Sequence, residues 1–382
     1  MRIKIGLFID TFYPMIDGVV TVVDNYARIM SKYAKVYVFA PNTGKYDDTK
    51  LPYKVIRCKS KKVKGKDYRV PIPKLDKKFM KELENIDLDV VHIHSPFTMG
   101  KLGIEYAKKN NKVLMGTIHS QYKQDFLRNT KSKILSKILT SYVMNLYRQC
   151  DVCYTVNEGI EKIVLEEYKL NRKLLIARNA TTMELSNDIK KSRKRINELH
   201  NLKDTDNVFL FVGRLNKLKN IFLIVDSLNK IKDKINFKML FVGTGQDEKE
   251  LKNKIKEYNL EDRIVLCGKI SDRELLRDYY TRSDLFLFPS LYDASSVVQV
   301  EAASQKTPTL FLKKAATAAN IIDNHNGYLT DKENYSNKIL EILSDKKKYK
   351  EVCENTYKEL YITWDDEVKK VYDKYIEVLK EK

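Results

Sequence analysis

Two basic residues follow an apolar run at a point where a parallel sheet would bind its ligand. Arg214 comes just after the run at 208–212, and Lys219 comes just before an apolar helical segment that begins at Ile221. The start of a helix carries partial positive charge, and two cations beside it add to that charge. Together they suit a diphosphate group without requiring a metal ion. The alternative is that both residues are solvated loop cations.

Carboxylates and hydroxyls lie together in a second segment of the same half. Asp293 precedes an expected helix and Glu301 lies two turns into it, with Ser295 and Ser296 placed to cap its start. Backbone N–H groups at this start, including that of Val297, could hold phosphate, and a helix-borne carboxylate can accept bonds from two adjacent ribose hydroxyls. On their own, an Asp and a Glu at this spacing would be weak evidence for a nucleotide site.

Glycine turns follow apolar runs in both halves. Gly18 ends the loop 10–18 after the first run, and Gly243 follows the run at 239–242. A glycine just before a helix lets a phosphate approach the backbone closely, whereas the alternative is an ordinary tight turn. The first turn lacks the Gly-x-Gly-x-x-Gly pattern, which argues against a dinucleotide cofactor held in the usual way.

Apolar runs of strand length alternate with helix-length segments along the chain. They lie at 3–9, 36–39, 90–93, 113–118 and 152–156, and again at 208–212, 239–242, 264–267, 285–288 and 309–312. This rhythm predicts an α/β fold with two doubly wound parallel sheets. A polar stretch at 184–207 places the boundary near residue 185, which gives domains 1–184 and 185–362. Residues 363–382 form an amphipathic helix that must dock on another surface, and we expect it to return to the first domain.

The composition is that of a soluble globular protein. The chain has 382 residues, 43% apolar and 32% charged, and no apolar run approaches the ~18 residues of a membrane-spanning helix. We therefore expect a cytoplasmic location.

Five cysteines in apolar contexts argue against a disulfide framework. Cys150 and Cys153 form a lone Cys-x-x-Cys pair, which buried small side chains explain better than a redox or zinc site.

The net charge of +20 is concentrated in the first half of the chain. Residues 1–184 carry 34 Lys and Arg against 19 Asp and Glu, which leaves +5 for the remainder. Such a field attracts polyanions, so composition alone allows a nucleic acid, an anionic membrane or merely solvated lysines. The chain has no RNA-binding aromatic signature and no convincing helix-turn-helix pattern, so we expect no nucleic-acid partner.

Basic and apolar residues are interleaved at helical spacing between residues 123 and 148. The cations are Lys123, Arg128, Lys131, Lys133, Lys137 and Arg148, and the apolar residues are Ile134, Leu135, Ile138, Leu139, Tyr142 and Leu146. A basic amphipathic helix of this kind can lie on an anionic bilayer, and residues 59–66 supply a second basic cluster. The alternative is that the apolar stripe packs on the sheet and the cations are solvated.

Taken together, the motifs resemble those of glycosyltransferase family 4, which has the GT-B fold. The matching segments are 10–18, 92–97, 117–122, Gly213 and Arg214 with Lys219, 243–245, 284–290, 293–301, 326–329 and the tail with Trp364, in order over essentially the whole chain. The resemblance implies two Rossmann-like domains facing a cleft. It also implies transfer of a hexose from a nucleotide diphosphate sugar with retention at the anomeric carbon, without a metal or other cofactor.

The resemblance further implies roles for individual residues. Arg214 and Lys219 would neutralise the leaving diphosphate, Glu301 would hold the ribose, and Asp293 would contact the donor sugar. His119 would lie beside the anomeric centre. The rest of the donor site would consist of Gly18, Gly243, Ser295, Ser296 and Val297.

The sequence departs from the family near the sugar end of this site. Asp293 replaces a Glu, Ser-Ser-Val at 295–297 replaces the usual Gly-Leu, and residues 315–320 replace a Gly-Gly-x-x-Glu turn. The donor base and sugar therefore stay open, and an inactive transferase remains an alternative. His92, His94 and His119 could be grouped as a metal triad, but the family has a metal-free cleft at these positions.

The acceptor is interpreted from the first half of the chain. Membrane-attached family members that glucosylate diacylglycerol are similar through 10–18 and 94–97. The resemblance therefore implies a donor of the UDP-glucose type, a lipid acceptor, and a peripheral position on the anionic inner face of the membrane. The alternative is a glycan or polyprenyl-linked acceptor, as in capsule or wall polysaccharide assembly.

Overall fold

The computed structural model describes residues 2–15, 17–63 and 69–382. The chain forms two compact units, one made of Met1–Asn179 with Trp364–Lys382 and the other of Ala180–Thr363. The division comes slightly before the boundary that the polar stretch suggested near 185. The reason is that the backbone N–H of Thr181 already donates to the carbonyl oxygen of Ile362 at 3.0 Å, which ties this segment to the second unit.

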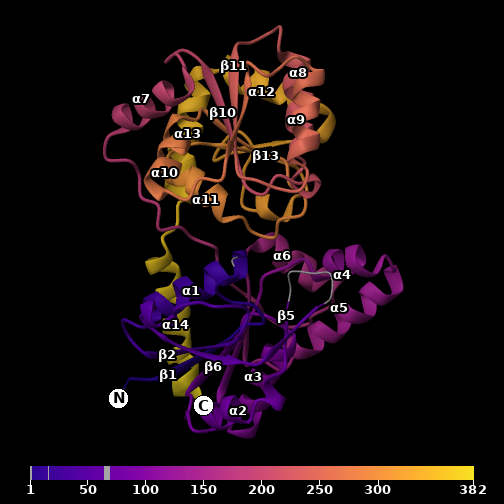
Figure 1. Ribbon diagram of the computed structural model, residues 1–382, viewed down its shortest axis with the longest axis vertical. Helices are drawn as coiled ribbons and strands as arrows, with labels where there is room; N and C mark the ends of the chain where they lie inside the picture. The colour runs from indigo at the N-terminus through magenta and orange to yellow at the C-terminus, as the bar shows by residue number, and fades with distance from the viewer. Residues whose placement is uncertain (1, 16, 64–68) are drawn as a thin grey trace. The chain divides into compact units, whose positions relative to one another are not determined.

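The first unit is built on a parallel sheet with the strand order β3-β2-β1-β6-β7-β8-β9. Figure 1 labels β1, β2 and β6 of this sheet. Its strands are β1 (Lys4–Phe8), β2 (Lys35–Pro41), β3 (Lys54–Cys58), β6 (Val90–Ile93), β7 (Val113–Ile118), β8 (Val152–Thr155) and β9 (Leu175–Ile176). Strands β6 and β7 are buried along their whole length, as expected for a sheet covered on both faces. An antiparallel ribbon of β4 (Ser60–Lys62) and β5 (Arg69–Pro71) follows β3.

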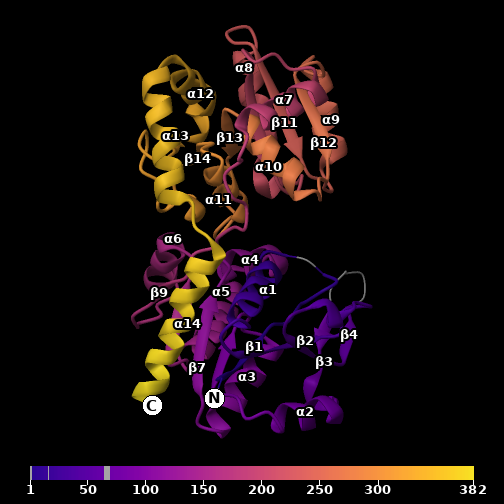
Figure 2. The ribbon, with the colours of Figure 1, turned by 90° about the vertical axis from the view of Figure 1, so that its left-hand side faces the viewer.

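The chain's last helix completes the first unit. The helices of this unit are α1 (Gly18–Met30), α2 (Lys77–Glu84), α3 (Thr98–Lys109), α4 (Tyr122–Thr130), α5 (Lys133–Tyr147), α6 (Glu158–Lys162) and α14 (Trp364–Glu381). Helix α14 lies beside α1 (Figure 2) and buries Val368, Val371 and Tyr375. The amphipathic tail thus finds its docking surface on the first unit, far away in sequence.

The basic segment at 123–148 is not the single helix that its periodicity predicted, so that expectation was wrong. The first helix ends at Thr130, and Lys131 has a positive φ of 55°. Ser132 then caps the second helix by accepting a hydrogen bond from the backbone N–H of Leu135 at 3.2 Å. Because serine favours a new helix start, the segment folds as the two contacting helices α4 and α5.

The second unit repeats the same architecture with the strand order β12-β11-β10-β13-β14-β15. Its strands are β10 (Asn207–Val212), β11 (Phe237–Val242), β12 (Ile264–Gly268), β13 (Leu285–Phe288), β14 (Thr309–Leu312) and β15 (Tyr328–Thr330). Its helices are α7 (Ile189–His200), α8 (Ile221–Ile231), α9 (Glu248–Glu257), α10 (Arg273–Arg282), α11 (Val297–Ser304), α12 (Tyr335–Ser344) and α13 (Lys346–Leu360). Both sheets are parallel with helical crossovers, so the predicted α/β class is confirmed.

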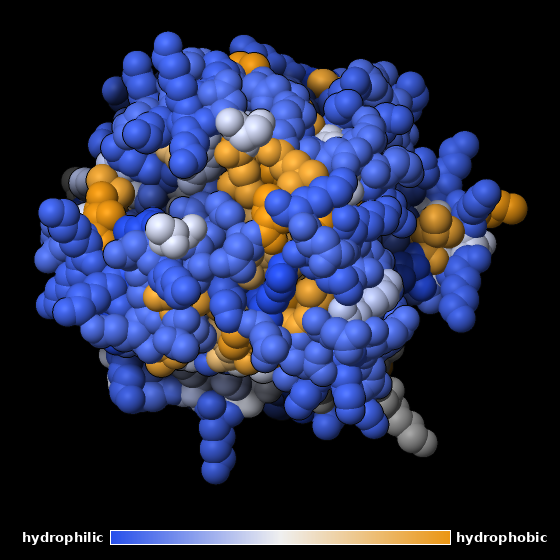
Figure 3. All heavy atoms as spheres, turned by 90° about the horizontal axis from the view of Figure 1, so that it is seen from above, coloured by the Kyte–Doolittle hydropathy of each residue, from blue (hydrophilic) through white to orange (hydrophobic). Residues whose placement is uncertain are grey.

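Hydrophilic residues cover most of the face of the molecule seen in Figure 3, with hydrophobic residues visible in patches between them. In the described part of the chain, no helix is long and apolar enough to cross a membrane. Cys150 and Cys153 are buried free thiols. Within the basic segment 59–66, Lys64 and Lys66 lie outside the described residues.

Candidate active site

The carboxyl ends of β10 and β11 meet in a close backbone contact. Gly213 and Gly243 follow these strands, and both have positive φ values, 155° and 136°. A Cβ atom on Gly243 would lie 1.9 Å from the carbonyl oxygen of Gly213, so a larger residue would displace the backbone. Gly243 therefore helps to shape the loop that carries Arg214.

Arg214 and Lys219 come from the loop between β10 and α8. Asn220 fixes the end of this loop, since its side-chain amide donates to the carbonyl oxygen of Pro289 at 2.8 Å. The Lys219 Nζ forms an ion pair with Asp293, and the two side chains are only 18% and 16% exposed. Arg214 is exposed, and its guanidinium makes no hydrogen bond or ion pair with the residues described here. The structure thus brings Lys219 and Asp293 together and leaves Arg214 available.

The start of α11 lacks the side-chain cap that the sequence predicted. Ser296 occupies the N-cap position, but its hydroxyl makes no capping hydrogen bond, so that part of the prediction was wrong. Its backbone N–H instead donates to the Thr317 hydroxyl at 3.1 Å, and that hydroxyl donates to Gln299 at 2.6 Å. Backbone N–H groups in the first turn, including that of Val297, therefore donate no bond to the Ser296 hydroxyl and are suited to an anion. Ser295 lies next to them in the same loop.

Glu301 is buried on α11, and both oxygens of its carboxylate accept hydrogen bonds. Oε1 accepts from Nη2 of Arg273 at 2.7 Å, and Oε2 accepts from the hydroxyl of Tyr280 at 3.0 Å. The Arg273 side chain is 54% exposed, so it can leave the carboxylate without unfolding anything. Burial and the Glu301 carboxylate raise the pKa of the Tyr280 hydroxyl well above its usual value, which keeps that hydroxyl a donor.

Sequence reasoning missed Arg273 and Tyr280. Both lie on α10, and their spacing of seven residues places them on one face of that helix. This spacing is the one signal in the sequence that the two side chains act together. It does not indicate which carboxylate lies opposite that face of α10.

Stacked histidines lie at the ends of β6 and β7 in the first unit. The ring centroids of His92 and His94 are 4.1 Å apart, and those of His94 and His119 are 5.3 Å apart. His94 Nδ1 and His119 Nε2 share a hydrogen bond at 3.1 Å, while His92 Nε2 bonds to the Thr117 hydroxyl at 2.7 Å and Nδ1 bonds to Tyr375 of α14.

These histidines are neutral near pH 7. Burial lowers the pKa of His119 to about 3 and lowers the pKa values of His92 and His94 well below the usual range. Among the residues that the structure describes, no group of His, Cys, Asp and Glu side chains is arranged to hold a metal ion. His119 can exchange a hydrogen bond with a ligand but carries no charge.

The loop after β1 is hydrogen-bonded to the segment after β6, so the motifs at 10–18 and 92–97 lie together. The Asp10 carboxylate accepts hydrogen bonds from the Ser95 hydroxyl at 2.7 Å and from the backbone N–H of Met99 at 3.0 Å. Burial raises the pKa of Asp10 to about 6.

Gly18 begins α1 with open space around it, but the carboxylate of Asp17 caps that helix by accepting from the backbone N–H of Val20 at 2.8 Å. An anion at Gly18 would have to share the helix start with this carboxylate.

The outer side of α4 and α5 carries apolar side chains that the described residues leave exposed. We call this set the exposed apolar face: Leu127, Ile134, Leu135, Ile138 and Tyr142, with exposed fractions of 37%, 76%, 43%, 59% and 50%. The inner side of α5 buries Ser136, Thr140 and Val143. The sequence left open that the apolar residues of segment 123–148 pack on the sheet. That alternative is wrong for the exposed apolar face, although Leu146 of the same segment is buried.

Cations surround the exposed apolar face. Lys131, Lys133 and Lys137 are exposed, and their side chains form no hydrogen bond or ion pair with any described residue. Lys123 pairs with Glu167 at 3.1 Å, and Arg128 pairs with Asp125 at 3.3 Å. Beside Tyr142 opens an apolar groove of about 540 Å³, lined by Leu75, Phe97, Leu102 and Tyr142 with Lys74 and Lys101 among its polar residues.

The chain matches two family models in succession. Residues 16–182 match "Glycosyltransferase Family 4", and residues 192–359 match "Glycosyl transferases group 1". The alpha-monoglucosyldiacylglycerol synthase of Acholeplasma laidlawii is 26% identical over 98% of this chain and 96% of its own length.

Solved structures match the whole fold at lower identity. The match to the sucrose-phosphate synthase of Thermosynechococcus elongatus covers 100% of both chains, with a TM-score of 0.82 and 18% identity. Anabaena HepE in complex with UDP-glucose covers 100% of both chains with a TM-score of 0.73 and 16% identity. This chain therefore belongs to glycosyltransferase family 4 and is a glycosyltransferase of the GT-B fold.

Proposed function

We propose that this enzyme transfers glucose from UDP-glucose to a membrane lipid such as diacylglycerol, with retention at the anomeric carbon. The observation that carries the proposal is the exposed apolar face, which combines apolar side chains with unpaired lysines on one surface. Such a surface fits an anionic bilayer, because the apolar residues enter the interface and each lysine adds about 1 kcal/mol of attraction. The name of the Acholeplasma relative supports the lipid acceptor, and the Anabaena complex supports the donor.

The donor diphosphate would bind in the second unit. Arg214 and Lys219 supply positive charge, and the first turn of α11 supplies backbone N–H groups. When the bond between the anomeric carbon and the phosphate oxygen breaks, negative charge grows on the diphosphate. Because Arg214 and Lys219 stabilise this charge, we propose that the reaction needs no metal ion.

The nucleoside and the sugar would contact the carboxylates. Glu301 accepts bonds from both ribose hydroxyls when Arg273 moves aside, while Tyr280 keeps the carboxylate oriented. Asp293 exchanges its ion pair with Lys219 for a sugar hydroxyl as Lys219 turns to the diphosphate. His119, neutral at pH 7, bonds a hydroxyl without competing for the phosphate.

The proposal is tested with radiolabelled UDP-glucose and vesicles that contain diacylglycerol and an anionic lipid. We expect a monoglucosyl lipid with the α-linkage by NMR, formed equally well with EDTA present. A soluble or polyprenyl-linked glycan as the only labelled product would replace the lipid proposal with the glycan acceptor. A β-linked product would refute retention.

A matched pair of variants tests the exposed apolar face. Ile134→Ser with Ile138→Ser removes two of its side chains, while Ile189→Ser with Leu199→Ser removes two exposed apolar side chains from α7. We expect the first variant to lower transfer to vesicles about tenfold, which corresponds to partial burial of two side chains, and the control to be unchanged. Equal loss in both variants would contradict the membrane role.

A further inference from the structure

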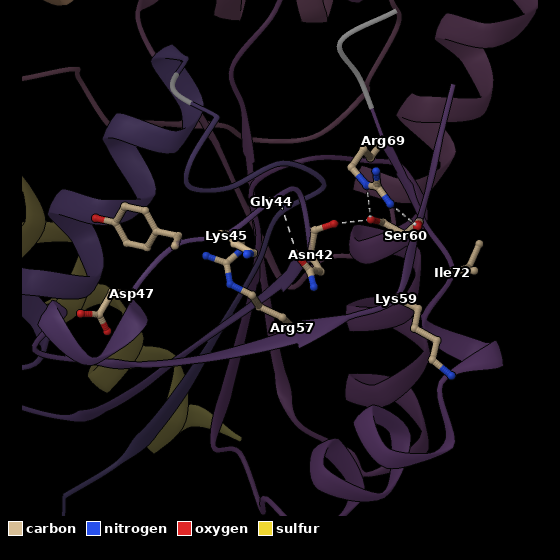
Figure 4. A pocket seen from close by; sticks show the side chains of 10 residues that line it. Asn42, Gly44, Lys45, Asp47, Arg57, Lys59, Ser60, Arg69 and Ile72 are labelled. Atoms are coloured by element: carbon tan, nitrogen blue, oxygen red, sulfur yellow. Dashed lines mark hydrogen bonds between the residues drawn. The ribbon is translucent and has the colours of Figure 1, made fainter. Parts of the chain in front are cut away.

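A second cationic site lies in the first unit, at the carboxyl ends of β2 and β3. A pocket of about 1010 Å³ opens there, lined by Asn42, Gly44, Lys45, Tyr46, Asp47, Arg57, Lys59, Ser60, Arg69 and Ile72 (Figure 4). These residues come from the loop after β2, from the end of β3 and the residue after it, and from the ribbon β4–β5 and the residue that follows it. Ligands of parallel sheets bind at this edge, so the position is suited to a ligand.

The pocket is strongly positive. Four cationic side chains line it, and Asp47 is the single carboxylate among its described lining residues, while Asp48 just outside the lining pairs with Arg57. The ammonium groups of Lys45 and Lys59 are exposed and form no hydrogen bond or ion pair with any residue in the described ranges. Their charge is therefore available to an incoming anion.

The two arginines of the pocket are held in place by the protein. Nε and Nη2 of Arg57 donate to the carboxylate oxygens of Asp48 at 2.6 and 2.8 Å, and Nη1 donates to the carbonyl oxygen of Pro41 at 3.1 Å. Nε and Nη2 of Arg69 donate to the hydroxyl and carbonyl oxygens of Ser60 at 2.8 and 2.9 Å. A guanidinium has five N–H donors, so each arginine keeps donors for a ligand.

This arrangement matches phosphate chemistry. Planar guanidinium groups bind the oxygens of phosphate in pairs, and flexible lysines add point charges around them. Counted against the carboxylates of Asp47 and Asp48, the four cations leave an excess of two positive charges, and a phosphate ester carries one or two negative charges and several acceptor oxygens. The pocket also differs from the proposed donor site, whose diphosphate contacts come from the second unit.

We propose that this pocket binds a phosphate ester, as an anion site of the first unit that is separate from Arg214 and Lys219. The ester belongs either to a soluble metabolite or to a phospholipid headgroup. Ile72 lines both this pocket and the apolar groove beside Tyr142, so the surroundings suit either source. The inference does not depend on the identity of the sugar acceptor.

Calorimetric titration of the full chain at constant ionic strength tests the site with three probes. These are inorganic phosphate, glycerol 3-phosphate and dihexanoyl phosphatidylglycerol below its micelle concentration. We expect saturable binding of a phosphate compound in the absence of any nucleotide. Tighter binding of glycerol 3-phosphate than of the short lipid identifies a soluble ester, and the reverse order identifies a headgroup. Absence of saturable binding for all three probes overturns the proposal.

Matched lysine variants show whether the pocket is responsible. Lys45→Met with Lys59→Met removes two pocket cations, and Lys35→Met with Lys78→Met removes two exposed lysines outside the pocket. We expect the first pair to raise the dissociation constant about tenfold or more and the control pair to leave it unchanged. Equal effects of the two pairs would mean that only net charge matters and would overturn the site.

A titration with UDP separates this inference from the proposed function. Both lysine pairs should bind UDP like the wild type, since the proposed nucleotide contacts lie in the second unit. Saturable phosphate binding by an enzyme that fails to glucosylate lipids would leave the pocket standing and refute only the acceptor proposal.

Discussion

The two units use their cations in different ways. In the second unit Lys219 pairs with Asp293 and Arg273 pairs with Glu301, so these cations are held against carboxylates. In the first unit Lys131, Lys133 and Lys137 beside the exposed apolar face and Lys45 and Lys59 of the cationic pocket form no such pairs with described residues. Among the cations discussed there, the exceptions that pair with carboxylates are Lys123, Arg128 and Arg57. A paired cation is positioned for one ligand, whereas exposed unpaired lysines create a field that attracts polyanions. Much of the excess charge of the first half therefore lies on an exposed surface, whereas the second half has the smaller excess of +5 and holds Lys219 and Arg273 against carboxylates.

Removing the paired cation tests the second unit with the largest expected effect. Lys219→Ala should lower kcat by about 10²–10³-fold, because the charge on the departing diphosphate loses a stabilising partner. Steady-state kinetics with UDP-glucose measures this loss. Lys217→Ala is the matched control, since Lys217 lies in the same loop, is 62% exposed and pairs with Glu250. Near-normal turnover of the Lys219 variant would remove it from the site.

Removing unpaired cations tests the first unit. Replacing Lys131, Lys133 and Lys137 together by Gln should weaken binding to anionic vesicles about 100-fold, at about 1 kcal/mol per lysine. Co-sedimentation measures the partition, and the matched control replaces Lys190, Lys191 and Lys194 of α7 by Gln.

Added salt sharpens the same comparison. It should weaken vesicle binding of the wild type more than UDP binding, because exposed charges are screened more than partly buried ones. Salt-insensitive vesicle binding would contradict an electrostatic role for these lysines.

Removing the carboxylate partner of Lys219 should give the smallest effect. Asp293→Asn frees the ammonium group from a partly buried ion pair, so affinity for UDP should rise about fivefold, which corresponds to about 1 kcal/mol. Calorimetry with UDP measures the change. A fall in UDP affinity would show that Asp293 positions Lys219 for the diphosphate and does not compete with it.

Much of the scaffold could be predicted from the sequence. Each apolar run that was read as a strand lies in a strand of the parallel sheets, because buried strands need continuous apolar residues. Strands β3, β9 and β15 were missed because they are short or contain charged residues, as at Lys54 and Arg57. The loops that carry Arg214, Lys219 and Asp293 were found because each follows such a run.

Contacts between distant segments could not be predicted. The partners of Glu301 are Arg273 and Tyr280, and nothing in the spacing of α10 indicates that its face meets α11. Likewise, the ion pair between Lys219 and Asp293 joins residues 74 positions apart. Such pairs depend on how helices pack across a sheet, which local periodicity does not encode.

By itself, the sequence determined the α/β class, the positions of the loops at the carboxyl ends of the strands and the family. Only the tertiary structure decided which amphipathic faces are covered. Helices α5 and α14 both have apolar stripes in the sequence, yet α14 buries Tyr375 against the first unit while α5 leaves Ile138 exposed and turns Ser136 inward. The physical reason is that periodicity places residues on a common face, but burial depends on whether a neighbouring element has a matching surface to cover it.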